Sequence, residues 1–94
     1  MSYKLVFKKA AKEEWDKLEP SIKEQFKKKL KERLVYPAIE ASRLSTLKDY
    51  YKIKLRSVGY RLVYQLREKE LVVSVVAIGK RERNAAYMAE IKRL

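Results

Sequence analysis

The chain has 94 residues, which suits one compact domain spanning residues 1–94 and leaves no room for a second hydrophobic core. Its content of 47% hydrophobic and 11% aromatic residues is enough to bury a core, so wholesale disorder is excluded. There is no Cys and no His, which excludes disulfides, thiol catalysis and cysteine-based zinc sites and removes the usual acid–base group at neutral pH.

The balance of 24 Lys and Arg against 12 Asp and Glu gives a formal charge of +12. So strong a positive field predicts a polyanionic partner, and nucleic acid leads because phosphate neutralisation supplies most non-specific affinity. An acidic protein, an anionic membrane or a solvated basic surface without a specific ligand would fit the same charge. The first residues, MSYKLVFKK, lack the apolar run of a signal peptide, and no stretch is long enough to span a membrane, so we expect a cytoplasmic protein.

The first half of the chain predicts one strand and two helices. Residues 3–7 alternate as a short strand does, and a helix over residues 10–18 carries Trp15 toward the core. Pro20 opens a second helix that ends near Val35. Its apolar positions recur every four residues: Ile22, Phe26, Leu30 and Leu34. Its basic residues, Arg33 among them, are interspersed with glutamates, which favours a solvated face over a phosphate-binding one.

The second half predicts three strands and a last helix. Residues 36–47 lack periodicity and read as a loop, whereas residues 50–55 and 60–66 alternate on either side of an RSVG turn, as in a hairpin. Residues 71–78, LVVSVVAI, are typical of a central strand buried on both faces. Gly79 ends that strand, and Asn84 caps a helix over residues 85–94. The expected fold is α+β, a small antiparallel sheet packed against two N-terminal helices with a C-terminal helix, in the order βααβββα.

Cations gather on one face of the predicted hairpin. Strand alternation directs Lys52, Lys54 and Arg61 to the side opposite the apolar residues. Arg81 lies just beyond the next strand, and Tyr87 lies on the first turn of the last helix, where both would complete the cluster. The pattern alone leaves alternatives open, because outward lysines also protect sheet edges from aggregation and a helical tyrosine is an ordinary core contact.

The segments YKIKLRSVGYRLVYQ and VAIGKRERNAAY, with EQFKKKL in the second helix, resemble the core of RelE-type toxins over nearly the whole chain. The resemblance implies a microbial-ribonuclease-like fold and cleavage of messenger RNA in the A site of the 70S ribosome, with no metal and no cofactor. It also implies contact with ribosomal RNA, inhibition of translation, a role in stress response and neutralisation by a RelB-like antitoxin.

The resemblance carries over to individual residues. The family's active site would fall on Lys52, Lys54, Arg61, Arg81 and Tyr87. Further RNA contacts would come from Arg43, in the loop that reads ASRLSTL, and from Lys80 and Arg83.

The implied mechanism is attack of the ribose 2′-hydroxyl on the adjacent phosphate, giving a 2′,3′-cyclic phosphate and a 5′-hydroxyl. Arg61 would clamp the phosphate, since a guanidinium matches its oxygens bidentately, and Arg81 would stabilise the leaving oxygen electrostatically. Lys52 or Lys54 is the candidate for accepting the hydroxyl proton, because crowding by like charge favours the neutral amine. Tyr87 would stack on a base or hydrogen-bond the nucleophile.

Two rival functions fit the same sequence. One is a ParE-like toxin that attacks DNA gyrase without nuclease activity, and the other is a non-catalytic RNA-binding module for which the charge of +12 suffices. Metal catalysis is disfavoured, because neither His nor clustered Asp pairs offer ligands.

Overall fold

The structure is a computed structural model of the chain and describes residues 2–39, 43–44 and 49–80. The predicted strands and the first two helices are confirmed with small shifts of their ends; the predicted helix over residues 85–94 lies outside the described residues. In chain order the elements are β1 (Lys4–Phe7), α1 (Lys9–Lys17), α2 (Pro20–Val35), β2 (Tyr50–Leu55), β3 (Tyr60–Arg67), the short 3₁₀ helix η2 (Glu68–Glu70) and β4 (Val72–Lys80).

The four strands form one sheet in the order β1-β4-β3-β2. β4 pairs with a neighbour on each side and is buried from Val73 to Ile78, which confirms that the LVVSVVAI segment is central. The expectation of a purely antiparallel sheet is wrong, because β1 runs parallel to β4. The helical connection makes β1 and β2 run in the same direction, and two reversals, β2 to β3 and β3 to β4, bring β4 parallel to both.

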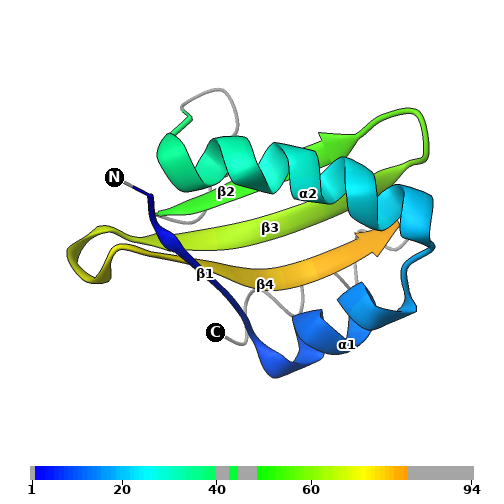
Figure 1. Cartoon of the computed structure of the whole chain (residues 1–94), viewed down its shortest axis with the longest axis horizontal. Coiled ribbons are helices and arrows are strands. Elements are labelled where there is room, and N and C mark those ends of the chain that lie inside the picture. Colours follow the sequence, from blue (N-terminus) through cyan, green and yellow to red (C-terminus); the bar gives the residue numbers. More distant parts are fainter. Residues whose placement is uncertain (1, 40–42, 45–48, 81–94) are drawn as a thin grey trace.

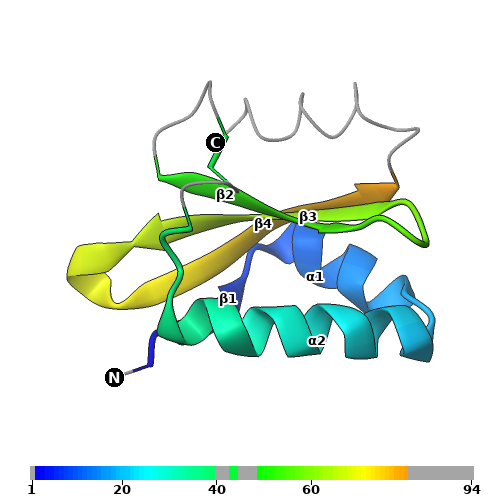
Figure 2. The ribbon, with the colours of Figure 1, turned by 90° about the horizontal axis from the view of Figure 1, so that it is seen from above.

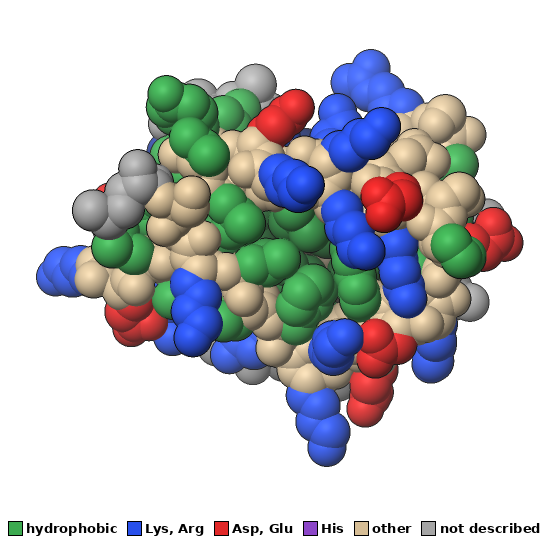
Figure 3. All heavy atoms as spheres, in the orientation of Figure 1, with side chains coloured by type: hydrophobic (Ala, Val, Ile, Leu, Met, Phe, Trp, Pro, Cys, Tyr) green, Lys and Arg blue, Asp and Glu red, His purple; other side chains and the backbone are tan. Residues whose placement is uncertain are grey.

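Both helices cover the same face of the sheet, with α1 packed on β4 and α2 on β2 (Figures 1 and 2). Phe26 is completely buried, and the ring of Trp15 lies 6.3 Å from that of Phe26 and 5.2 Å from that of Phe7. Trp15 is therefore a core residue, as predicted. Around the apolar centre of this face, Lys and Arg side chains lie among Asp and Glu (Figure 3), which agrees with the solvated, mixed-charge surface expected of the helices.

Arg33 departs from that expectation, because it is half-buried and bonds across the core. Its Nη1 donates to the Tyr64 hydroxyl at 2.9 Å and, over 3.4 Å, to the carbonyl oxygen of Lys52. The Tyr64 hydroxyl in turn donates to the carbonyl of Pro37 at 2.6 Å, and its ring stacks on Tyr51 at 5.6 Å. Burial raises the pKa of Tyr64 above 10.0, and the hydrogen bond from Arg33 offsets part of that rise. This network ties the end of α2 to β2 and β3.

Candidate active site

The face of the sheet away from the helices carries the predicted cations. On β2, Tyr51, Ile53 and Leu55 belong to the helix-side core, so strand alternation places Lys52 and Lys54 on the opposite face. The same alternation places Arg61, between two residues of the helix-side cluster, beside them. The strands β2, β3 and β4 contain no Asp or Glu, so on this face they contribute cations without acidic neighbours of their own.

One cross-strand row brings two of the cations together. Lys54 on β2 lies directly opposite Arg61 on β3, and Arg61 lies opposite Gly79 on β4. Directly opposed residues have Cβ atoms about 4.5–5.5 Å apart, and like charges at that spacing destabilise a strand pair. An anion held between the two side chains reverses that repulsion. Gly79 adds no side chain to the row.

A hollow of about 270 Å³ adjoins this row where β2 and β3 meet. Its lining includes Lys54 and Arg61 together with four residues of the hairpin end: Leu55, Arg56, Gly59 and Tyr60. The turn that closes it is held by a hydrogen bond of 2.9 Å from the Gly59 amide to the Leu55 carbonyl, and Gly59 has a positive φ of 69°. The hollow is therefore built on a closed hairpin, which positions its cations better than an open loop would.

Lys52 lies one step further along β2, opposite Val63. Val63 forms a small apolar cluster on this face with Val76 and Ala77, and Leu44 packs against it. The backbone of Arg43, the neighbour of Leu44, bridges to that of Tyr51 at the outer edge of β2. The structure thus brings Arg43 beside the strand that carries Lys52 and Lys54.

The side chain of Lys80 lies on a different side of the strand end from that of Arg61. The pairing of β3 with β4 shifts between Val63 and Tyr64, where Val76 is an extra residue without a partner. Beyond this bulge Lys80 lies opposite Tyr60, and its Nζ is 5.8 Å from the centre of the Tyr60 ring, which packs against the helix-side core. Lys80 therefore lies on the Tyr60 side of the strand end, whereas Arg61 lies on the other.

With this geometry established, comparison with known proteins identifies the family. Residues 5–85 match the family model described as the ParE toxin of the type II toxin–antitoxin system parDE. The chain is 51% identical over its full length to the mRNA interferase toxin RelE of Escherichia coli K12, covering 99% of that protein. This chain belongs to the RelE/ParE toxin family.

Solved structures of the RelE branch share the fold. A mutant of E. coli RelE in the free state, with two arginines replaced by alanine, matches with a TM-score of 0.89 at 49% identity, covering 100% of this chain and 99% of that one. The toxin of the intact E. coli RelBE toxin–antitoxin complex matches with a TM-score of 0.82 at 52% identity, covering 84% of this chain and 96% of that one. The α+β architecture of this chain is therefore that of the RelE toxins.

Within this RelE-like fold, the structure brings together Lys52, Lys54 and Arg61 and places Arg43 near them. Arg81, Arg83 and Tyr87 lie outside the described residues. Analysis of the sequence missed Arg56, which had been read only as part of a turn although it follows Lys54 by two residues, the spacing of one strand face. In residues 2–39, 43–44 and 49–80, no group of acidic side chains gathers as metal ligands would, and no helix has the length and apolar character of a membrane span.

Proposed function

We propose that this chain is the toxin of a type II toxin–antitoxin system and an endoribonuclease that cleaves messenger RNA in the ribosomal A site. The observation that carries the proposal is the Lys54–Arg61 pair, two cations directly opposed beside an open hollow. Its full-length identity of 51% to an mRNA interferase supports the same function.

The chemistry needs few protein groups because RNA supplies its own nucleophile. The ribose 2′-oxygen forms a bond to phosphorus while the bond from phosphorus to the 5′-oxygen breaks, leaving a 2′,3′-cyclic phosphate and a 5′-hydroxyl. Arg61 binds the equatorial phosphate oxygens bidentately, and the neighbouring Lys54 adds charge where the transition state concentrates it. The proton of the 2′-hydroxyl passes to the neutral amine of Lys52, or to that of Lys54, which in that case gains its charge as it takes the proton. The departing 5′-oxygen takes a proton from water and becomes the 5′-hydroxyl.

The remaining site residues complete this scheme. Arg81 stabilises charge on the 5′-oxygen as it leaves, since a guanidinium gives up its proton too reluctantly to be a general acid. Tyr87 stacks on a base or hydrogen-bonds the nucleophilic hydroxyl, and Arg43, Lys80 and Arg83 contact RNA. No metal and no cofactor takes part.

Because the chain has no His, the candidate site lacks a side chain that readily takes up and releases protons at neutral pH. We infer that the ribosome aligns the message and supplies the missing acid–base group. Contacts with ribosomal RNA would then contribute to the site. Efficient cleavage of free RNA by the purified toxin, at the rate seen on ribosomes, would contradict this dependence.

The partner in the cell is a RelB-like antitoxin, as in the RelBE complex of E. coli. An acidic, amphipathic antitoxin segment would complement the charge of +12 and mask the basic face until it is removed. Release of the toxin would then stop translation in the cytoplasm as part of a stress response.

The test is primer extension on a defined message in a reconstituted translation system, with and without ribosomes. Wild-type protein should cut within codons only when ribosomes are present, and Arg61→Ala and Arg81→Ala should each lower the cleavage rate about 10²–10³-fold, as loss of a transition-state donor does. An intact message in the presence of ribosome-bound wild-type toxin would overturn the nuclease proposal.

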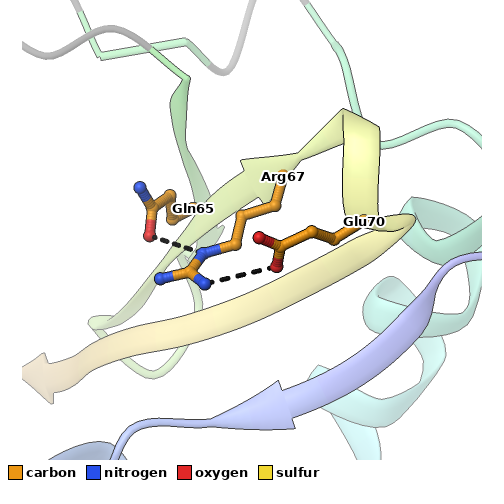
Figure 4. A network of polar contacts seen from close by, with 3 residues as sticks. All are labelled: Gln65, Arg67 and Glu70. Atoms are coloured by element: carbon orange, nitrogen blue, oxygen red, sulfur yellow. Dashed lines mark hydrogen bonds and ion pairs between the residues drawn. The ribbon is translucent and has the colours of Figure 1, made fainter.

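The matched control is Arg67→Ala, on the same strand as Arg61 but at its far end. Arg67 Nη1 lies 3.3 Å from the Glu70 carboxylate, and its Nε lies 3.5 Å from the side-chain oxygen of Gln65 (Figure 4). This variant removes the same charge from the same strand, so it should cleave at nearly the wild-type rate. A comparable loss in Arg67→Ala would show that net charge, and not the Lys54–Arg61 site, governs the rate.

The family model that matches is described for ParE toxins, which favours DNA gyrase as the second candidate target. Gyrase assayed for supercoiling in the presence of the toxin separates the two. Inhibited gyrase together with uncut messages would replace the ribonuclease by the gyrase-directed function.

A further inference from the structure

Arg56 is an exposed cation with no role in the architecture of the fold. It lies in the turn between β2 and β3, and within the described part of the chain it has no hydrogen-bond or ion-pair partner. Two basic side chains at the ends of neighbouring strands differ from it in this respect: Arg67 pairs with Glu70, and Lys80 lies over the Tyr60 ring. Neither packing nor pairing accounts for Arg56.

The position of Arg56 is nevertheless well defined. The turn is closed by the hydrogen bond from the Gly59 amide to the Leu55 carbonyl, and Val58 donates to the same carbonyl at 3.3 Å. A Cβ added at Gly59 would meet no atom within 4 Å, so glycine is favoured there by its φ of +69° and not by crowding. The backbone that carries Arg56 is therefore a compact turn, continuous with β2.

Arg56 shares its hollow with the two opposed cations. Lys54, Arg56 and Arg61 all line the same space of about 270 Å³, and its other described lining residues, Leu55, Gly59 and Tyr60, are uncharged. Several cations that line one hollow give it a positive potential, which attracts an anion. The geometry therefore fits a ligand with more than one negative charge.

The order of the cations suits successive phosphates of one RNA strand. Arg56 directly follows the end of β2, so a phosphate held between Lys54 and Arg61 leaves Arg56 one position further along the lining of the hollow. A guanidinium there presents a fork of donors that matches a second phosphate. Such a contact positions the strand without touching the reacting atoms.

We propose that Arg56 binds the phosphate next to the scissile phosphate and thereby holds the message in register over the Lys54–Arg61 pair. The inference rests on the proposed function, since it assigns part of the RNA strand to a subsite of that enzyme. Arg56 is a positioning residue: it strengthens binding of the uncut strand and of the transition state equally, so its loss should raise KM and leave kcat unchanged.

The experiment measures kcat and KM for cleavage on ribosomes programmed with a synthetic message, using wild type, Arg56→Gln and the matched control Arg67→Gln. Arg56→Gln should raise KM about 5–10-fold with kcat within about twofold, whereas Arg67→Gln should change neither. Thermal unfolding of each variant checks that the fold is kept. An unchanged KM in Arg56→Gln, or a fall in kcat with KM unchanged, would overturn the assignment.

A second arm of the experiment identifies which phosphate Arg56 binds. Messages carry one uncharged methylphosphonate linkage at each position flanking the cut site, which distinguishes a phosphate of the message from one of ribosomal RNA. One neighbouring position should raise KM 5–10-fold for wild type and add nothing for Arg56→Gln. Additive losses at every position would show that Arg56 does not contact the message. Failure of wild type to cut any message overturns the proposed function itself, which is distinct from a cutting enzyme that ignores Arg56.

Discussion

The two faces of the sheet are built from the same strands but differ in role. One face packs against the helices, and the other carries the cations of the candidate site. On β2, alternate residues enter the helix-side core, of which Ile53 is 1% exposed, while Lys52 and Lys54 between them lie on the other face. The helix-covered face is apolar with mixed charges at its rim (Figure 3), whereas the strands give the other face cations and a small apolar cluster but no acidic residue. Because side chains alternate along β2 and β3, a substitution on one face of these strands need not disturb the other face. Stability and chemistry should therefore respond to different substitutions.

The largest effect on stability is expected at the centre of the helix-covered face. Phe26→Ala removes a ring that is 0% exposed and contacts Trp15, so the free energy of unfolding should fall by about 3–5 kcal/mol. Urea unfolding followed by tryptophan fluorescence measures it. A loss below about 1 kcal/mol would show that α2 is not held by this core.

The basic face should show the reverse behaviour. Lys52→Ala should lower the cleavage rate on ribosomes about 10²-fold or more if Lys52 takes the hydroxyl proton, a typical value for a general base. Its free energy of unfolding should stay within about 1 kcal/mol of wild type, because the hydrogen bond from Arg33 reaches the Lys52 main-chain carbonyl, which the substitution keeps. A full rate in Lys52→Ala would transfer the role of base to Lys54.

The network of Tyr64 ties α2 to the sheet, and the titration of Tyr64 gives stability a dependence on pH. Tyr64→Phe removes the donor to the Pro37 carbonyl and an acceptor of Arg33, which should cost about 1–3 kcal/mol of stability at neutral pH. Because the folded protein raises the pKa of Tyr64, its phenol keeps the proton more tightly when folded. That stabilisation is full below the unfolded value of 10.0 and is lost as pH rises from there through the higher folded pKa.

The measurement is the free energy of unfolding of wild type and Tyr64→Phe between pH 8 and 11.5. The stability of wild type should fall more steeply above about pH 10 than that of the variant, since other tyrosines and lysines contribute equally to both. Parallel curves would mean that burial of Tyr64 does not perturb its titration.

Local patterns in the sequence predicted what depends on neighbours along the chain. The recurrence of Phe26 and Leu30 predicted α2, and the alternation on either side of Gly59 predicted the hairpin and the face of its cations. The parallel pairing of β1 escaped prediction because a strand's partner is set by packing across the fold and not by its own residues. The bulge that turns Lys80 toward Tyr60 likewise depends on the register between two strands.

Two arginines have surroundings that the sequence does not reveal. Composition cannot distinguish Arg33, which bonds to Tyr64 on a strand 31 residues away, from a solvated cation of the same helix. The turn that contains Arg56 was predicted correctly, but the hollow that Arg56 shares with Arg61 depends on how β2 and β3 pair. For a long cation, function depends on what the fold places beside it, and the sequence does not contain that information locally.

The smallest expected effect concerns the far end of β3, where Arg67 and Glu70 form an exposed ion pair of 3.3 Å between residues three apart. A double-mutant cycle with Arg67→Ala and Glu70→Ala should give a coupling of about 0.2–0.5 kcal/mol, because solvent screens exposed charges and ordering the side chains offsets much of the attraction. Urea unfolding at low and high salt measures it, and salt should reduce the coupling further. Arg67 and Arg61 share a strand and a charge, so a nearly full cleavage rate in Arg67→Ala together with a large loss in Arg61→Ala would show that catalysis depends on where the cation lies and not on the number of cations. A coupling above about 1 kcal/mol would instead make Arg67 a structural residue and disqualify it as the control for the basic face.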